Sequence, residues 1–511
     1  MDPTSKVIPD GIVWVEGVRI KAVSPAAAPP PPKFVAGDIV NTAGTIYPGL
    51  IELHNHLSYN CLKTWKVPQL YTNRDRWGSH PDYRKLISGP TKVLGSTEGL
   101  PAALVRYVEA KCLLSGVTTS QGITLQSIRL ERFYKGVIRN VEVKTMAELP
   151  AAKAKISDVE ATDASKFLAR LRRDRCVILH LAEGKDPGAR SHFTDLKLPD
   201  GAWALAPSLV GIHCAALESA DFKVMAKFGA SMVWSPLSNL LLYGGTADIK
   251  AAKAAGVRIA LGSDWSPSGS KNLLAELKVA KAVSDNGGGI FSDREIVAMA
   301  TTSPAAMLSW GENLGSLEAE KIADLIVVDG TAEDPYLQLI EASEADLALV
   351  MIGGVRRLAR TNLMDGAANP EPWTVDGKKK VLNLQDADSD PLVSGLTLAA
   401  AVKKLKDGLA DLPKLAKDLE KPKPAGLRKK DFVTLKLDHE EPSGEAIRPR
   451  FATAKVKPLR LAPVVALAAA PPLSQILQPM TLDAITVADD ATYVSLLKQQ
   501  SNIPQAIRNA L

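Results

Sequence analysis

The sequence predicts an α/β fold in which parallel strands close into a barrel. Short apolar runs alternate with Ala-, Lys- and Glu-rich helical patterns, which is typical of βαβ units. Several of these runs end in histidine or an acid, and barrels of parallel strands build their active sites at that end. The chain has 511 residues, whereas such a barrel needs only about 250, so we expect further domains.

Seven apolar runs are candidates for strands of this barrel, and they lie near residues 49, 117, 137, 177, 209, 231 and 258. Helical patterns lie between them, for example over residues 102–114, 163–172 and 273–283. A closed barrel of this kind has eight strands. We therefore expect an eighth strand between residues 120 and 176, or a barrel that is distorted there.

The first run ends in two histidines that are one residue apart. Residues 47–56 read Tyr-Pro-Gly-Leu-Ile-Glu-Leu-His-Asn-His. Side chains i and i+2 share one face of a strand, so His54 and His56 are expected to point the same way. Two such imidazoles can bind one divalent ion, although two polar residues that merely close a strand have the same pattern.

Later runs end in residues of the same kind. His180 and Glu183 close one run, His213 closes another, and Asp264 closes a further one. Each of them alone is also typical of a hydrogen-bonded polar residue at a strand end. Together with the first pair they indicate a shared metal site, because ligands from distant strands converge at this end of a barrel.

The order of these motifs resembles the amidohydrolase superfamily. It is most similar to the mononuclear branch with cytosine, guanine and adenosylhomocysteine deaminases and triazine hydrolases. The matching residues are His54, His56, His180, Glu183, His213, Ser235-Pro236-Leu237-Ser238-Asn239 and Gly262-Ser263-Asp264. The resemblance runs from about residue 8 to about residue 360. It implies a (β/α)8 barrel beside a small β-sandwich.

The resemblance also implies a role for each of these residues. Four of them would hold one divalent metal ion per chain, with Zn²⁺ as the first choice and Fe²⁺ as the alternative: His54, His56, His180 and Asp264. Such an ion lowers the pKa of bound water from 15.7 towards roughly 7. Asp264 would take the proton, Glu183 would carry a proton to the substrate, and His213 would hydrogen-bond the hydroxide or the attacked carbonyl. The expected activity is hydrolysis of a non-peptide C–N bond in a small molecule, by deamination or cyclic-amide hydrolysis.

Other chemistries stay open at this point. The same residues suit displacement of another leaving group, such as halide at a triazine-like carbon. A binuclear amidase or lactonase would instead place a carboxylated lysine between two metals, and Lys144 ends a run where such a lysine could sit. A non-catalytic binding protein on the same fold would require a lost ligand, and none is lost here.

Residues 57–92 form a long insertion directly after the first strand. Long loops at this end of a barrel are usually functional, so the aromatic residues here are expected to cover the substrate, although ordinary loop packing has the same composition. The residues expected in the substrate pocket are Trp65, Tyr71, Trp77, Trp265 and Asn239. His192 fits a helix surface better than the pocket, and His439 fits a solvated tail.

Three domains are expected. Residues 1–45 and 315–362 would form the small β-sandwich that the resemblance implies, and residues 46–314 would form the barrel. Within the first flank, residues 11–22 read as a β-hairpin around a Glu-Gly turn. Residues 363–511 would form a C-terminal extension whose role is open.

The C-terminal extension has local signals of its own. Residues 396–419 have the Lys/Leu/Ala pattern of a helix, and residues 432–437 read as a strand. We expect part of the extension to fold as a small helical or α+β appendage.

The composition bears on partners and location. A net charge of +6 is mild for this length and gives no argument for nucleic acid. The chain has no apolar span of ~18 residues and no apolar N-terminal segment. We therefore expect a cytoplasmic protein without a membrane partner, although the start at Asp2-Pro3 does not exclude a removed leader. The expected partner is a small-molecule substrate, and a homodimer is a possible assembly.

The four cysteines lack paired spacing and are expected to be buried thiols.

Overall fold

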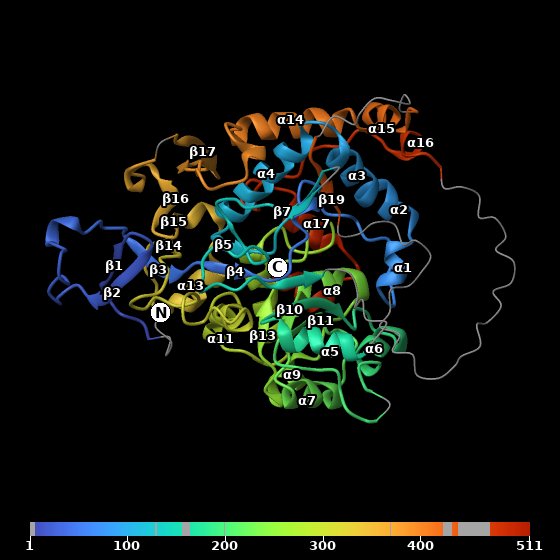
Figure 1. Cartoon of the computed structure of the whole chain (residues 1–511), viewed down its shortest axis with the longest axis horizontal. Helices are drawn as coiled ribbons and strands as arrows, with labels where there is room; N and C mark the ends of the chain where they lie inside the picture. The colour runs from blue at the N-terminus through green and yellow to red at the C-terminus, as the bar shows by residue number, and fades with distance from the viewer. Residues whose placement is uncertain are drawn as a thin grey trace, which may run out of the picture.

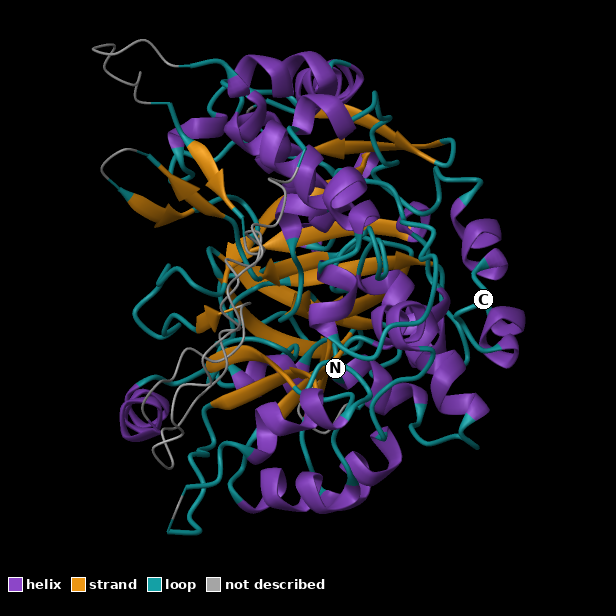
Figure 2. Ribbon diagram, turned by 90° about the vertical axis from the view of Figure 1, so that its right-hand side faces the viewer, coloured by secondary structure: helices purple, strands orange, loops and turns teal. Residues whose placement is uncertain are grey.

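The computed structural model has a barrel of parallel strands at its centre (Figures 1 and 2). It describes residues 6–127, 130–155, 164–198, 200–367, 369–422, 432–437 and 471–511. Three parallel strands form one part of the barrel: β4 (Leu50–Glu52), β5 (Val117–Ser120) and β8 (Arg139–Asn140). Five parallel strands form the other part: β9 (Lys153–Lys155), β10 (Val177–Leu181), β11 (Leu209–His213), β12 (Ser231–Trp234) and β13 (Ile259–Leu261).

Backbone hydrogen bonds at the strand ends join the two parts. Between β8 and β9, the Ala152 amide donates to the Val141 carbonyl at 2.8 Å. Between β13 and β4, the His56 amide donates to the Asp264 carbonyl at 2.6 Å, and the Asp264 amide donates to the His54 carbonyl at 3.0 Å. The second junction therefore brings the first two histidines and Asp264 side by side.

The eighth strand is β9, which lies in the interval where the sequence predicts either a missing strand or a distortion. Residues 153–155 pair in parallel with residues 177–179 of β10. β9 has only three residues and two of them are lysines, so no apolar run marks it in the sequence. The seven strands expected from apolar runs are all present.

Helices follow the strands and cover the barrel (Figure 2). The expected helical patterns appear as α4 (Leu100–Leu114), α5 (Ala164–Arg173) and α10 (Leu273–Asn286). Fourteen of the fifteen residues of α4 are buried, which is unusual because an outer barrel helix normally exposes one face. The reason is that α14 (Leu398–Ala410), from the C-terminal extension, packs along α4 (Figure 1).

An antiparallel sheet of six strands lies beside the barrel, in the order β17-β18-β16-β15-β14-β3. Its strands are β3 (Gly44–Pro48), β14 (Leu325–Asp329), β15 (Leu347–Ile352), β16 (Val355–Arg360), β17 (Glu371–Val375) and β18 (Lys378–Leu382). The pairing of β3 with β14 joins the N-terminal flank to the segment that follows the barrel. Because β17 and β18 belong to the same sheet, the sheet continues beyond residue 362.

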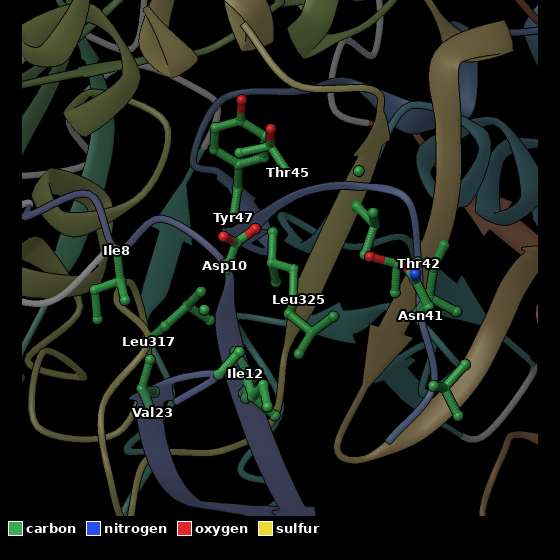
Figure 3. Close-up of a pocket in the computed structure, with 18 of the residues that line it drawn as sticks. Ile8, Asp10, Ile12, Val23, Asn41, Thr42, Thr45, Tyr47, Leu317 and Leu325 are labelled. Carbon is green, nitrogen blue, oxygen red and sulfur yellow. The ribbon is translucent and has the colours of Figure 1, made fainter. Parts of the chain in front are cut away.

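The expected N-terminal hairpin is confirmed as β1 (Gly11–Glu16) and β2 (Arg19–Pro25), which form a separate two-stranded sheet. A cavity of about 1190 Å³ lies between this hairpin and the six-stranded sheet (Figure 3). Apolar side chains such as Ile12, Val23 and Leu325 line it. The histidines at the ends of the barrel strands do not line this cavity. The cavity and the metal-ligand candidates therefore belong to different parts of the molecule.

The C-terminal extension returns to the barrel in the ranges that the structure describes. The expected helix and strand are confirmed by α14 with α15 (Leu412–Glu420) and by β19 (Thr434–Lys436), which pairs with β6 (Thr124–Gln126). Three short helices follow: α16 (Leu473–Ile476), α17 (Tyr493–Gln499) and α18 (Gln505–Ala510). His439 lies outside the described residues.

Two further features concern the cysteines and the helices. All four cysteines are buried free thiols, as predicted: Cys61, Cys112, Cys176 and Cys214. Among the helices that the described ranges contain, none is long and apolar enough to cross a bilayer.

Candidate metal centre

The polar residues at the strand ends converge into one buried cluster. Their possible ligand atoms lie within 4.8 Å of one another in three overlapping groups: His54, His56 and His180; His54, His213 and Asp264; His180, Glu183 and His213. Each of these six residues is at most 4% exposed. These residues lie at or just after the ends of β4, β10, β11 and β13. The barrel therefore brings together residues that are more than 200 positions apart in the chain.

Left-handed backbone lies at three of these strand ends. The φ angle is 66° at His213, 67° at Asp264 and 51° at Ala182, two residues after His180. A non-glycine residue in this region costs on the order of 1–3 kcal/mol, and such residues cluster at functional sites where the surroundings enforce them. The strained turns end the strands abruptly and fix the direction of the side chains that follow.

Gly262 makes room for the first ligand pair. A Cβ atom at this position would lie 2.4 Å from the His54 Cβ and 2.9 Å from the His54 carbonyl oxygen. Any other residue would push the end of β13 away from β4. The glycine of the Gly262-Ser263-Asp264 motif therefore permits the close approach of Asp264 to His54 and His56.

His54, His56 and Asp264 point their ligand atoms at a common position. The two Nε2 atoms are 3.3 Å apart, and each lies 3.4 Å from Asp264 Oδ1. His54 Nδ1 lies 2.7 Å from Ser235 Oγ, so a proton on Nδ1 can be donated there while Nε2 stays available. Imidazole nitrogens and a carboxylate oxygen form a donor set that Zn²⁺ and Fe²⁺ accept, so these residues fit a divalent ion.

Burial sets the protonation of the cluster. Desolvation lowers the pKa of His213 to about 4, although Asp264 opposes this shift, and desolvation also lowers the pKa of His180. Both rings are therefore neutral near pH 7, which is the form that binds metal. Burial raises the pKa of Asp264, and a divalent cation would oppose that shift because it favours the carboxylate.

A chain of hydrogen bonds sets the tautomer of His213. Trp234 Nε1 donates to Thr246 Oγ1 at 2.7 Å, and the Thr246 hydroxyl donates to Asn239 Oδ1 at 3.2 Å. The Asn239 amide nitrogen, which can only donate, lies 3.0 Å from His213 Nδ1. The ring proton is therefore on Nε2. This buried atom faces the cluster and has no hydrogen-bond partner among the described residues, so it can donate to an oxygen bound there.

Tyr243 and Arg74 contact Glu183, and Trp77 supports Tyr243. Of these three residues, only Trp77 was expected near the site. Tyr243 Oη donates to Glu183 Oε1 at 2.7 Å and accepts from Trp77 Nε1 at 2.8 Å. Arg74 Nη1 lies 3.6 Å from Glu183 Oε2. The sequence does contain a signal for Tyr243. It lies four residues after Asn239 on α8 (Pro236–Tyr243), and such residues share a helix face.

A second layer of contacts fixes the ends of β4 and β13 to each other. Glu52 Oε1 accepts from the Ser263 amide at 2.9 Å and from the Ser263 hydroxyl. Asn55 Nδ2 donates to Glu52 Oε2 at 2.8 Å. Burial raises the pKa of Glu52, and these donors oppose that shift by stabilising its carboxylate.

The aromatic residues expected around the substrate are all buried. The Trp265 ring lies 5.4 Å from that of His56, centroid to centroid, so Trp265 borders the cluster, and Trp77 packs against Trp265 at 5.7 Å. Trp65 and Tyr71 pack against each other, with ring centroids 6.3 Å apart. Contact with a substrate stays a prediction for all four.

Three further residues are placed by the structure. Lys144 is exposed after β8 and lies outside the cluster, so the bridging lysine of a binuclear site is missing there. His192 is 8% exposed on α6 (Pro187–Thr194), and the expectation of a surface position was therefore wrong. His80 caps α2 (Pro81–Tyr83), because its Nδ1 accepts from the Asp82 amide at 3.2 Å.

The chain is similar to one protein family and to several deaminases. Residues 174–357 match the Amidohydrolase family. A 5-methylthioadenosine/S-adenosylhomocysteine deaminase from Moorella thermoacetica is 28% identical in an alignment of 386 positions, which covers 68% of this chain and 87% of that protein. A 5'-deoxyadenosine deaminase from Methanosarcina mazei is 23% identical, over 64% of this chain and 82% of its own.

Solved structures share the fold at lower identity. An adenosine deaminase from Xanthomonas campestris with bound zinc has a TM-score of 0.55 at 18% identity, covering 80% of this chain and 95% of its own. A mutant atrazine chlorohydrolase from Arthrobacter aurescens, in complex with zinc and atraton, has a TM-score of 0.55 at 17% identity, covering 80% and 97%. At this identity the likeness concerns the fold.

Proposed function

We propose that this chain is a metal-dependent deaminase of a small purine-like molecule, within the amidohydrolase superfamily. The observation that carries the proposal is the buried convergence of His54, His56 and Asp264 with Glu183 a few ångströms away. The relatives named for deamination of adenosine derivatives support an adenine nucleoside as the substrate class.

We infer that one divalent ion is held by four residues: His54, His56, His180 and Asp264. The zinc in the two neighbouring structures supports Zn²⁺ as the first choice. When bound, the ion supplies Lewis acidity and makes water a nucleophile near neutral pH. The lowered pKa of His180 supports this assignment, because a neutral imidazole can bind the ion. The lowered pKa of His213 keeps a second ring beside the ion neutral, which avoids repulsion of the cation.

Asp264 and Glu183 divide the proton transfers in this proposal. The Asp264 carboxylate accepts the proton of the attacking water, and Glu183 delivers a proton to the departing nitrogen. Tyr243 occupies Oε1 of Glu183, so Oε2 is the oxygen that carries the proton. This atom lies 3.8 Å from His213 Nε2 and 4.0 Å from His180 Nε2, at the edge of the ligand cluster.

His213 acts as a hydrogen-bond donor in the same scheme. The Asn239 contact places its ring proton on Nε2, which lies 3.9 Å from Asp264 Oδ2. A donor at this position orients the attacking oxygen and stabilises the negative charge that it carries once its proton has moved to Asp264. Support for this role comes from the neutral state of the buried ring, since a fixed N–H dipole needs no reorganisation during the reaction.

A panel of candidate substrates tests the proposal. Purified protein with a measured metal content is incubated with adenosine, 5'-deoxyadenosine, methylthioadenosine, guanine, a cyclic amide and a chlorotriazine, and ammonia and chloride release are measured. We expect ammonia from at least one adenine nucleoside and none from the Asp264→Asn variant. Chloride release alone would favour the displacement chemistry that the chlorohydrolase neighbour performs on its own substrate. No product from any member of the panel would contradict the deaminase proposal.

A further inference from the structure

We propose that Asp483, in the C-terminal segment 471–511, is a positioning residue for the metal centre. The inference rests on the proposed function, because it concerns the ligands assigned there. Asp483 would act through the buried lysine Lys111, which holds the loops that follow β4 and β13. These two loops carry three of the proposed ligands, His54, His56 and Asp264.

The C-terminal segment is built into the barrel rather than attached to its surface. Its apolar side chains belong to the same buried core as the barrel strands and helices. The deepest of them are Leu477, Tyr493, Leu497, Ile503 and Ile507, each at most 3% exposed. α18 packs against α10, the helix that follows β13.

Asp483 uses all its polar groups to bind barrel elements. Its Oδ2 accepts from Lys111 Nζ at 3.0 Å, and its Oδ1 accepts from Lys271 Nζ at 2.6 Å. Its amide donates to the Cys61 carbonyl at 3.1 Å, and its carbonyl accepts from Tyr107 Oη at 2.6 Å. The side chain is 1% exposed. One residue of the segment therefore contacts α4 and the loops that follow β4 and β13.

Lys111 connects this carboxylate to the two ligand-bearing loops. Its Nζ also donates to Ser266 Oγ at 2.7 Å and to the Asn60 carbonyl at 3.0 Å. Ser266 lies two residues after Asp264, and Asn60 lies four residues after His56. The three donor positions of the ammonium group are thus divided between Asp483 and the two loops.

Asn60 completes the link between the loops. Its Oδ1 accepts from the Ser266 amide at 2.8 Å, and its Nδ2 donates to Asn55 Oδ1 at 2.6 Å. Asn55 lies between the two histidines of the first ligand pair and donates to Glu52 and to Ser263. A shift of Lys111 would therefore reach the backbone on both sides of the ligand cluster.

The charge balance explains why a neutral residue cannot replace Asp483. Lys111 and Lys271 are 3% and 1% exposed in their side chains, and Asp483 lies between them. Asp490 reaches Lys271 at 2.5 Å but makes no such contact with Lys111. Without the Asp483 carboxylate, Lys111 would be a buried cation with only neutral partners, which is strongly unfavourable. It would lose its proton or move, and either change weakens its hold on Ser266 and Asn60.

The segment also fixes the insertion that covers the site. Gln500 Nε2 donates to the Trp65 carbonyl at 3.1 Å. Asn502 Nδ2 donates to the Gln69 carbonyl at 3.1 Å and to the Leu241 carbonyl of α8 at 2.8 Å. These contacts lie beside the two loops that Lys111 holds, so the segment supports the ligands and their cover together.

The test compares two matched variants in the full chain. Asp483→Asn removes the buried charge with almost no change in shape. Asp489→Asn makes the same change at an exposed position of the same segment, where the carboxylate contacts Thr486 and the Asp376 amide rather than a lysine. Zn²⁺ affinity is measured by competition with a chromogenic chelator, with circular dichroism to establish that each variant is folded.

We expect Asp483→Asn to lower Zn²⁺ affinity by about 10- to 100-fold, the effect typical of residues that orient metal ligands indirectly. Asp489→Asn should stay within about twofold of the unmodified chain. If Asp483→Asn does not fold, Ser266→Ala replaces it, because it removes only the hydroxyl that Lys111 holds, and a lower Zn²⁺ affinity is expected again.

Unchanged Zn²⁺ affinity in folded Asp483→Asn, even with a lower melting temperature, would contradict the inference, because a purely structural segment changes only stability. Unchanged affinity in Ser266→Ala would do the same if Asp483→Asn does not fold. Failure of the proposed function looks different. In that case the unmodified chain binds no Zn²⁺, or binds it and releases no ammonia from any substrate.

Discussion

Replacing Tyr243 with phenylalanine would test whether Glu183 reacts in the orientation that the structure gives it. The Tyr243 hydroxyl donates to Glu183 Oε1 at 2.7 Å and accepts from Trp77 Nε1 at 2.8 Å. A hydrogen bond to a charged group contributes about 1.5–3 kcal/mol. Since 1.36 kcal/mol corresponds to a factor of ten, we expect kcat to fall about 10- to 150-fold.

The assay is steady-state ammonia release, with the metal content measured on the same preparation. Metal content should not change, because the hydrogen bonds of the Tyr243 hydroxyl go to Glu183 and Trp77, which are not proposed ligands. Tyr134→Phe is the matched control. Its hydroxyl donates to the buried carboxylate of Glu109 at 3.1 Å, away from the cluster. The control should lose a similar amount of stability and keep its kcat.

Two results would refute this reasoning. An unchanged kcat in Tyr243→Phe would mean that Glu183 is not held by this hydroxyl when the proton is transferred. An equal fall in kcat in Tyr134→Phe would mean that the rate responds to general destabilisation of the fold and not to the orientation of Glu183.

Four further outcomes are expected. Asp264→Asn should abolish turnover and reduce metal content, and near-normal activity would remove the proposed mechanism. Glu183→Gln should keep the metal but lower kcat by at least ~10²-fold, the low end of general acid–base contributions; a metal-free variant would show a structural role instead. A strong chelator should abolish ammonia release and added Zn²⁺ should restore it, whereas full activity in the chelator would exclude a catalytic metal. Burial raises the pKa of Glu276 from 4.5 to about 8, so stability should fall as the pH rises from 4.5 to 8, and Glu276→Gln should flatten this part of the unfolding profile measured by urea titration.

The metal-ligand candidates were predictable from sequence because each lies at the end of an apolar run. In a barrel of parallel strands, that position alone is enough to bring His54, His180 and Asp264 together. β9 was not placed, because two of its three residues are lysines and only its pairing with β10 makes it a strand. Periodicity has nothing to detect in so short a polar segment.

The residues that hold Glu183 were harder to predict for a different reason. Tyr243 lies on a helix and Arg74 in the insertion, and both reach the carboxylate only through tertiary packing. Asp483 is more remote still, since about 370 residues separate it from Lys111 in the chain. No local pattern distinguishes it from the exposed Asp489 of the same segment.

The burial of the metal-ligand candidates has a consequence for the timing of the reaction. Each of these residues is at most 4% exposed, Trp265 lies beside His56, and Trp77 of the insertion packs against Trp265, so we expect part of the insertion to move aside when a substrate enters. Loop motions of this kind take place in microseconds to milliseconds and often set the turnover number. Entry and release then depend on the motion of the insertion, so higher solvent viscosity should slow both steps.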